Sequence, residues 1–193
     1  MSRNKEFDET VVVRKAMEVF WKQGYEKTSM QDLVDHMGIH RRSIYDTFGS
    51  KRSLFLASLA DYESMVSQGF TKIISHAPTV KQAIRDIFNN VIQSVESIDT
   101  PIGCLSVNTA TELSSLDPEI KQIVTNMFKN TEQMFQNMLE EGQEKGELSD
   151  SLNTTVTAQY LHTNLVGFRV LVKTDYSKEE LERILDLVVK VLD

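Results

Sequence analysis

The 193-residue sequence is poor in cysteine, proline and glycine, and it has no long apolar run. Its single cysteine, Cys104, excludes an intramolecular disulfide and a cysteine-rich zinc site, and it fits a reducing compartment. Three prolines and eight glycines suit a helical protein with few long loops. No segment approaches the roughly 20 apolar residues of a membrane-spanning helix, and the polar start MSRNKEFDET lacks the apolar core of a signal peptide. We therefore expect a soluble, cytoplasmic protein that does not bind membranes.

The sequence also lacks the residue sets on which enzymes and metalloproteins depend. It contains no nucleophile with a matching base and acid, and no phosphate-binding loop. Its four histidines, His36, His40, His76 and His162, do not have the spacing of metal ligands. We therefore expect no enzymatic activity, no metal and no cofactor.

The charges that are present are unevenly distributed along the chain. Residues 1–52 contain ten Lys and Arg against eight Asp and Glu, whereas residues 53–193 contain eleven against twenty, and the whole chain has a net charge of −7. A basic end on an acidic chain indicates a surface that meets a polyanion. The alternative is that both parts are ordinary solvated helix faces. With 40% hydrophobic and 25% charged residues, the composition is that of a globular protein.

Apolar residues recur at helical spacing throughout, and no segment alternates with the period of a strand for long. Ser29 and Asp117 are typical helix N-caps, and Gly24 and Gly38 are typical helix ends. The break SIDTPIG (97–103) is expected because Pro101 disfavours helix at the residue before it. The pattern predicts an all-α protein of about nine helices over residues 8–23, 30–37, 40–47, from about 50 onward, 79–96, 103–115, 118–145, 153–173 and 178–192.

The segment TSMQDLVDHMGIHRRSIYDTF (28–48) has the pattern of a helix-turn-helix. Gly38 supplies the turn, and Leu33 and Ile44 face inward from the two helices. The second helix then presents its front and flanks to a DNA major groove, where arginine pairs with guanine or phosphate and hydroxyl groups bond phosphate. Helix N-termini before and after it favour phosphate as well. The DNA-binding residues predicted in this way are Thr28, Ser29, Arg41, Arg42, Ser43, Tyr45, Thr47 and Lys51.

Three of the exposed positions permit other interpretations. Arg41 and Arg42 would alternatively form a solvated helix end without a partner, and Tyr45 would be half-buried packing. Asp46 stands inside the basic segment, where its carboxylate would repel phosphate. We therefore expect Asp46 to point away from DNA or to remove one backbone contact.

The segment TSMQDLVDHMGIHRRSIYDTFGSKRSLF, preceded by FWKQGYEKTS, resembles the N-terminal domain of the tetracycline-repressor (TetR/AcrR) family of bacterial regulators. The spacing of Gly38, Tyr45, Phe48, Lys51 and Leu54 carries the resemblance. It implies a three-helix DNA-binding domain over 1–52 and a helical effector-binding and dimerisation domain over 53–193. It further implies a homodimeric repressor that binds a palindromic DNA operator and is released by a small-molecule effector.

In the second domain, GCLSVNTATEL (103–113) resembles a segment in a subset of these regulators, which implies a helix that lines the effector cavity. Asn108 and Glu112 share a face of that helix and would fix the polar end of a largely apolar ligand, or else cap backbone or face solvent. His162 would bond a ligand, or else be a satisfied core histidine. The predicted effector-binding residues are Cys104, Asn108, Glu112, Phe128, Tyr160 and His162.

Cys104 follows a Pro-x-Gly break near a helix N-terminus, a setting that lowers the pKa of a thiol. This position favours a repressor that senses electrophiles or oxidants as an alternative to one that binds a ligand. A buried, inert cysteine is the simpler interpretation.

The last two predicted helices are apolar on more than one face, which places them centrally or at an interface. Two such helices from each subunit would build a four-helix dimer interface about a two-fold axis. The interface residues predicted on this basis are Leu161, Leu165, Phe168, Leu181, Ile184, Leu185 and Val188. An alternative of another class is a helical protein-interaction module without DNA binding, which leaves the clustered Arg and Lys residues unexplained.

Overall fold

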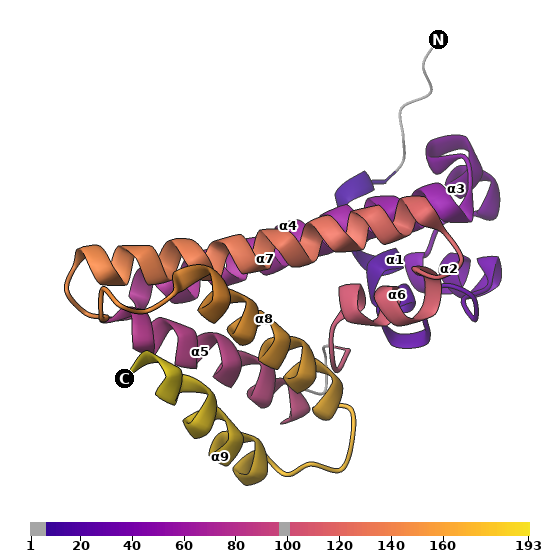
Figure 1. Cartoon of the computed structure of the whole chain (residues 1–193). Coiled ribbons are helices and arrows are strands. Elements are labelled where there is room, and N and C mark those ends of the chain that lie inside the picture. The colour runs from indigo at the N-terminus through magenta and orange to yellow at the C-terminus, as the bar shows by residue number, and fades with distance from the viewer. Residues whose placement is uncertain (1–6, 97–100) are drawn as a thin grey trace. The chain divides into compact units, whose positions relative to one another are not determined.

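The computed structural model describes residues 7–96 and 101–193, and within these ranges it contains nine α-helices and no strand (Figure 1). The predicted all-α fold is therefore confirmed. The helices are α1 (Glu9–Gln23), α2 (Met30–Met37), α3 (Arg41–Phe48), α4 (Lys51–His76), α5 (Val80–Gln93), α6 (Leu105–Leu113), α7 (Pro118–Glu144), α8 (Thr154–Leu171) and α9 (Lys178–Val188). None of the described helices is long and apolar enough to cross a bilayer.

Several helix ends differ from the prediction, and three of the differences have a clear structural form. The helices α5 and α9 tighten into short 3-10 helices at Ser94–Glu96 and Val189–Leu192, which the sequence pattern does not distinguish from α-helix. The helix α6 begins at Leu105 instead of 103, because Gly103 has a φ of +89° that no helical residue adopts. The predicted break over 97–103 lies partly outside the described residues, since 97–100 are not among them.

The chain divides into two compact units, Met1–Val66 and Ser67–Asp193, and the division falls within α4. The domain boundary expected between residues 52 and 53 stays a prediction. In the first unit, α1 packs on α2 and α2 packs on α3. The core of this unit is formed by fully buried apolar side chains from all four helices: Ala16, Phe20, Leu33, Ile44, Leu54 and Phe55.

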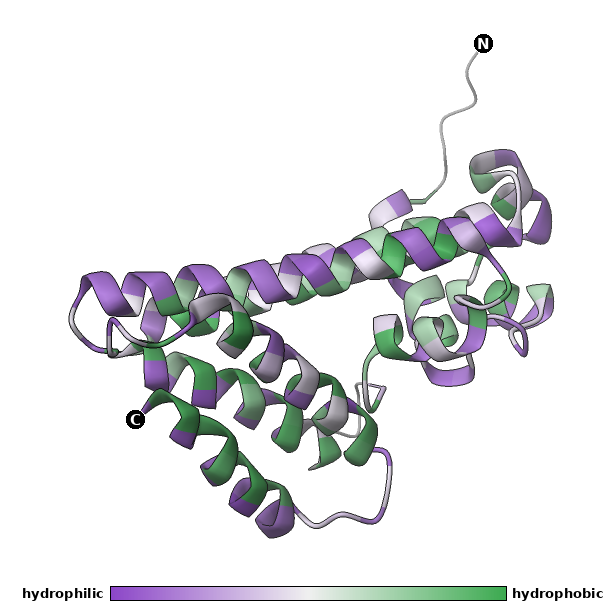
Figure 2. Ribbon diagram, viewed as in Figure 1, coloured by the Kyte–Doolittle hydropathy of each residue, from purple (hydrophilic) through white to green (hydrophobic). Residues whose placement is uncertain are grey.

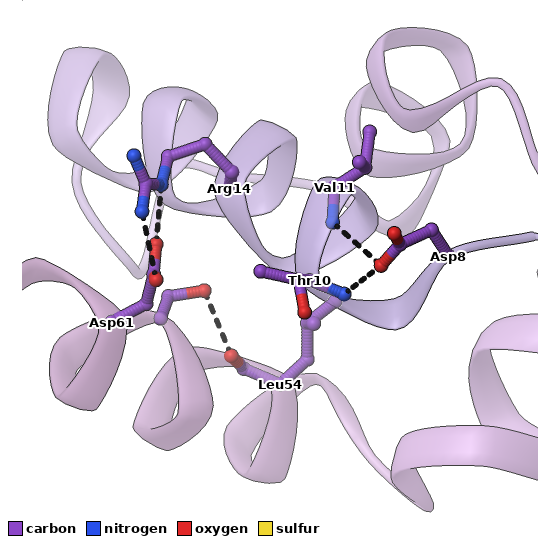
Figure 3. Close-up of polar contacts among 7 residues, drawn as sticks. Asp8, Thr10, Val11, Arg14, Leu54 and Asp61 are labelled. Carbon is purple, nitrogen blue, oxygen red and sulfur yellow. Dashed lines mark hydrogen bonds and ion pairs between the residues drawn. The ribbon is translucent and has the colours of Figure 1, made fainter.

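Polar contacts fix the start of α1 and its position against α4 within the first unit (Figure 3). The side chain of Asp8 caps α1 by accepting hydrogen bonds from the backbone N–H groups of Thr10 and Val11, at 2.8 and 3.4 Å. The guanidinium of Arg14 donates to both carboxylate oxygens of Asp61 in α4, from Nε at 2.5 Å and from Nη2 at 3.0 Å. This forked pair has a fixed geometry, so it sets the register of the two helices as well as attracting them.

In the second unit, α7 and α8 pack closely against each other, and α5 packs against α7, α8 and α9. Hydrophobic residues gather on α5, α8 and α9 (Figure 2). The ring of Phe88 in α5 meets the ring of Phe168 in α8 edge to face, with their centroids 5.1 Å apart. The apolar stripes of α8 and α9 are thus used first to close the core of their own chain.

Candidate nucleic-acid interface

The turn between α2 and α3 is built by residues whose local chemistry ends one helix and starts the next. Ser29 caps α2 in a reciprocal pair with Asp32, whose backbone N–H donates to Ser29 Oγ at 3.1 Å while Asp32 Oδ2 accepts from the Ser29 N–H at 2.8 Å. Gly38 then ends α2 in the left-handed conformation, with φ 71° and ψ 26°. Because Ile44 is fully buried against this frame, α3 is held with its opposite face outward.

The outward face of α3 carries Arg41, Arg42, Tyr45 and Asp46, all of them exposed. Tyr45 is 44% exposed, which argues against the packing role considered for it. The side chains of Arg42 and Asp46 are 89% and 70% exposed, and they form an ion pair at 3.5 Å, one turn apart. Asp46 therefore does not point away from the basic surface. It lies on that surface and partly neutralises one of its two arginines.

Lys51 lies at the first position of α4, where the backbone N–H groups of the helix favour an anion. Its Nζ is 4.3 Å from the centroid of the Tyr25 ring, a cation–π contact that limits where the ammonium group can lie. The hydroxyl of Ser50 accepts a hydrogen bond from the Ser53 backbone N–H at 3.0 Å and so caps this end of the helix. The ammonium group is thus preorganised beside a helix N-terminus.

The remaining predicted DNA contacts are less uniform. Ser43 and Thr47 are partly buried, and Ser43 lines a groove of about 380 Å³ beside Lys15, Gly38 and His40. Thr28 is buried, and its hydroxyl donates to the Gly24 carbonyl at 2.6 Å. A hydroxyl used in this way does not support the phosphate contact predicted for Thr28, whose visible role is to fix the turn before α2. The eight DNA contacts stay a prediction.

The structure brings together only some of the predicted effector residues. His162 of α8 is buried beside Phe128 of α7, with ring centroids 5.2 Å apart. Tyr160 is 40% exposed, because it lies on the opposite side of α8 from the core. A residue on that face does not line a cavity enclosed by the second unit. Tyr160 thus belongs to an outer surface instead.

Asn108, one of the two polar candidates of α6, has a partner from another part of the second unit. Asn108 Oδ1 accepts a hydrogen bond from Lys173 Nζ at 2.9 Å, a contact between α6 and the residues that follow α8. Glu112 is partly exposed. Cys104 is fully buried, and its Sγ lies 3.0 Å from the Oγ of Ser106. Asn108 and Cys104 therefore each have a polar neighbour within the chain. Neither residue is identified as a ligand contact.

The predicted dimer residues need a correction. Six of the seven are buried within the chain itself: Leu161, Leu165, Phe168, Leu181, Leu185 and Val188. Ile184 is partly exposed. A side chain covered by its own chain is not available to a second copy. The exposed large apolar residues of α8, α9 and the 3-10 helix that follows α9 are instead Val156, Tyr160, Val170, Leu187 and Val191.

Two polar residues of the second unit were missed by the sequence prediction, namely Glu132 and Arg169. Glu132 Oε1 is 3.3 Å from His162 Nδ1, and Arg169 is buried in α8. The signal for Arg169 is present in the sequence, since it stands between Phe168 and Val172 in an otherwise apolar stripe.

Comparisons with known proteins agree with the resemblance in the helix-turn-helix segment. Residues 12–58 match the family described as bacterial regulatory proteins, tetR family, and residues 81–188 match a tetracyclin repressor-like C-terminal domain. The HTH-type transcriptional regulator YezE of Bacillus subtilis is 34% identical over 194 residues, with 100% of both chains covered. The HTH-type transcriptional repressor ComR of Escherichia coli is 30% identical over 183 residues, or 94% of this chain and 87% of that protein.

A solved structure with the same fold is a cysteine mutant of the TetR family transcriptional regulator CifR, complexed with 26bp double-strand operator DNA. The two chains superpose with a TM-score of 0.89 and 24% sequence identity, and 100% of each is covered. At this identity the comparison shows a shared fold. The fold thus agrees with the family match.

Proposed function

Because the chain belongs to the tetR family of bacterial regulatory proteins, we propose that it is a transcriptional repressor that binds a palindromic operator as a homodimer and dissociates when a small-molecule effector binds. Membership of a family of regulators agrees with the expectation that the chain is not an enzyme. The proposal places the protein in the cytoplasm, on the nucleoid when it is bound to its operator.

The observation that carries the proposal is the exposed face of α3 behind the Gly38 turn. Arg41 and Arg42 extend from the first turn of this helix, and Tyr45 follows one turn later. A recognition helix enters the major groove with its N-terminal residues against the base edges. In this arrangement the arginines read guanine or hold phosphate, and Lys51 and Ser29 hold the backbone on either side.

A gel shift on the DNA upstream of the protein's own gene tests this assignment. Wild type is expected to form a discrete complex that competitor DNA of random sequence displaces poorly. Replacing Arg41 and Arg42 by alanine should abolish that complex. The matched control replaces Lys121 and Lys129, two exposed cations of α7, and it should bind as wild type does. Normal binding by the Arg41 and Arg42 double variant would refute the assignment and favour an interaction module without DNA binding.

The homodimer proposed here uses the outer face of α8 and α9. Val156, Tyr160 and Val170 lie on α8, and Leu187 on α9 is 63% exposed. Gly167 of α8 is also exposed, and a Cβ built there meets no atom within 4 Å, so a second helix can approach closely. Exposed apolar residues that recur along two adjacent helices are typical of a contact between subunits.

Sedimentation velocity on the full chain tests this surface. Leu187→Glu places a charge in the proposed contact and should convert the dimer to a monomer at micromolar concentration. Gln122→Glu, on the exposed side of α7, adds the same charge elsewhere and should leave the dimer intact. A Leu187→Glu protein that sediments as a dimer would exclude this face from the interface.

The effector is proposed to be a small, largely apolar molecule bound in the second unit. The alternative, a repressor that senses electrophiles or oxidants through Cys104, has one supporting observation, because the Ser106 hydroxyl at 3.0 Å is placed to donate to a thiolate. Cys104 is fully buried, so a reagent can reach its thiol only after the surrounding structure opens. Cys104→Ser separates the two, since it removes the response to thiol reagents while a response to a non-covalent ligand persists.

A further inference from the structure

Two largely buried polar side chains on α8 have polar atoms for which no hydrogen-bond partner is found among the described residues. His162 is 5% exposed and Arg169 is 6% exposed, and both belong to the second unit. They are separated by seven residues, which is close to two helical turns, so they lie on one face of α8. Most buried polar groups in native proteins are hydrogen-bonded, and those that are not require an explanation.

His162 has one nitrogen satisfied and one not. Its Nδ1 lies 3.3 Å from Glu132 Oε1 in α7, while its buried Nε2 has no hydrogen-bond partner. Burial lowers the pKa of His162, the charge of Glu132 raises it, and the charge of Arg169 lowers it again. In the resulting neutral ring, Nδ1–H donates to Glu132, and Nε2 is left as an acceptor that faces no donor.

Arg169 is largely buried, at 6% exposure, but its guanidinium nitrogens are not among the fully enclosed polar atoms that lack a partner, and the nearest described aromatic ring is that of Phe70. Its guanidinium carbon is 5.9 Å from the centroid of Phe70, which lies in the part of α4 that belongs to the second unit. Within residues 7–96 and 101–193, no hydrogen bond or ion pair of the guanidinium group is found. A largely buried and unpaired guanidinium offers a fork of N–H donors that matches a carboxylate entering from solution.

We propose that His162 and Arg169 form the polar end of a small-molecule site, whose ligand carries a carboxylate next to a hydroxyl or N–H donor on an apolar body. The carboxylate takes two N–H groups of Arg169, and the neighbouring donor bonds His162 Nε2. The ring of Phe70 lies beside Arg169 and the ring of Phe128 lies beside His162, so the two rings are placed to contact the apolar body. A phosphate dianion fits less well, because Glu132 repels it and Nε2 offers no proton.

This inference rests on the proposed function, since the ligand would be the effector of the repressor. It goes beyond that function by naming the chemical class of the ligand and the two groups that hold it. Glu132 is a positioning residue, because it selects the tautomer of His162 without reaching the ligand.

Thermal unfolding of the full-length dimer with defined probes tests the ligand class. Glycolate and mandelate carry the carboxylate and the hydroxyl, acetate and phenylacetate lack the hydroxyl, and glycolamide and mandelamide lack the charge. We expect the Tm to rise most with the hydroxy acids, less with the simple acids, and not at all with the amides or with sodium chloride at the same ionic strength. No rise with any carboxylate, or an equal rise with the amides, overturns the proposal.

Substitution of Arg169 separates a ligand-binding role from a structural one. Arg169→Met keeps the approximate length of the side chain and removes a largely buried residue's charge for which no counter-ion is found among the described residues, so the Tm of the ligand-free protein should stay the same or rise. The affinity for the hydroxy acids should fall at least tenfold. A fall in the ligand-free Tm by several degrees means that Arg169 is structural, and it overturns the proposal.

Two further variants complete the test. Arg85→Met removes an arginine that is paired with Asp186 at 2.7 Å, and it should keep the ligand response. His162→Phe should bind hydroxy acids and simple acids equally, because it removes the group that receives the hydroxyl. Retention of the hydroxy-acid preference by His162→Phe contradicts the role of Nε2.

Operator DNA distinguishes a failure of this inference from a failure of the proposed function. Arg169→Met should bind the operator as wild type does and should no longer be released by mandelate. If wild type binds the operator but no carboxylate releases or stabilises it, the inference fails and the function stands. If wild type binds carboxylates but not DNA, the proposed function fails instead.

Discussion

The ion pair between Arg42 and Asp46 leads to a prediction in which affinity and specificity change in opposite directions. Asp46→Asn removes the carboxylate but keeps the shape of the side chain. At side-chain exposures of 89% and 70%, the pair contributes little to the stability of α3, so the fold should be unaffected. The substitution releases Arg42 to contact phosphate and removes a group that repels it. We therefore expect tighter binding to DNA of any sequence.

The size of the effect follows from counterion release. One additional phosphate contact per subunit, or two per dimer, makes the slope of log K against log salt steeper by about 1.8. Between 50 and 200 mM salt, that slope corresponds to a change of about twelvefold in the advantage of the variant over wild type. Binding of random-sequence DNA should therefore improve strongly at low salt and only slightly at high salt. The ratio of operator affinity to random-sequence affinity should fall, because Asp46 no longer discourages phosphate contacts.

Fluorescence anisotropy with labelled operator and random duplexes, at four salt concentrations, measures both quantities. Asp150→Asn removes a negative charge from an exposed turn of the second unit, and it controls for the change in net charge. If Asp46→Asn and Asp150→Asn gave the same slope of log K against log salt, the reasoning would be refuted. That result would mean that Arg42 already contacts phosphate in wild type despite its pairing with Asp46.

Three further predictions concern the first unit. Lys51→Gln should weaken operator and random DNA alike and flatten the salt slope by up to about 1.8 per dimer, as measured by the same anisotropy titration. Ile44→Ala should lower the free energy of unfolding by about 2–5 kcal/mol in urea titration, because Ile44 is fully buried where α3 meets α2. The hydrogen bonds from Ser29 lower the pKa of Asp32 below its ordinary value of 3.8, so ionised Asp32 stabilises the fold above that pH. Asp32→Asn should therefore be less stable than wild type at neutral pH, and the difference in Tm should vanish as the pH falls through the folded-state pKa.

Each of these has a contradicting result. A Lys51→Gln protein that loses operator binding alone would make Lys51 a base reader. A small loss for Ile44→Ala would mean that the helix-turn-helix relaxes around the cavity. A Tm difference for Asp32→Asn that persists in acid would assign the effect to the amide itself and not to the charge.

The helices were predictable from the sequence because the signals that define them are local. Ser29 with Asp32, Asp117 before Pro118, and Ser177 with Glu180 all cap helices as their sequence pattern predicts. The exposed face of α3 was also predictable, since one glycine turn and one buried isoleucine fix which side of this helix faces outward. The helix-turn-helix is thus specified almost entirely within some thirty consecutive residues.

The second unit was less predictable because its important choices are non-local. The helices α8 and α9 have apolar residues on more than one face, and only the packing of α5 and α7 decides which face is inside. The prediction chose the most apolar stripe, exemplified by Leu165, and that stripe closes the chain's own core. For the same reason Tyr160 was assigned to a cavity although it lies outside. Likewise, no local pattern shows that His162 meets Glu132, thirty positions earlier.

Gly103, with its φ of +89°, has a consequence for the mutational tolerance of the chain. A Cβ at this position would lie 2.7 Å from the Lys173 side chain and 3.2 Å from the Arg169 carbonyl oxygen. Any amino acid other than glycine would therefore be strained and crowded at position 103. At the helical Gly69, in contrast, an added Cβ meets no atom within 4 Å. In a library that substitutes each glycine in turn, functional clones should retain glycine at position 103 and accept alanine freely at position 69. The backbone conformation at position 103 thus limits the sequence variation that this part of the molecule can accept.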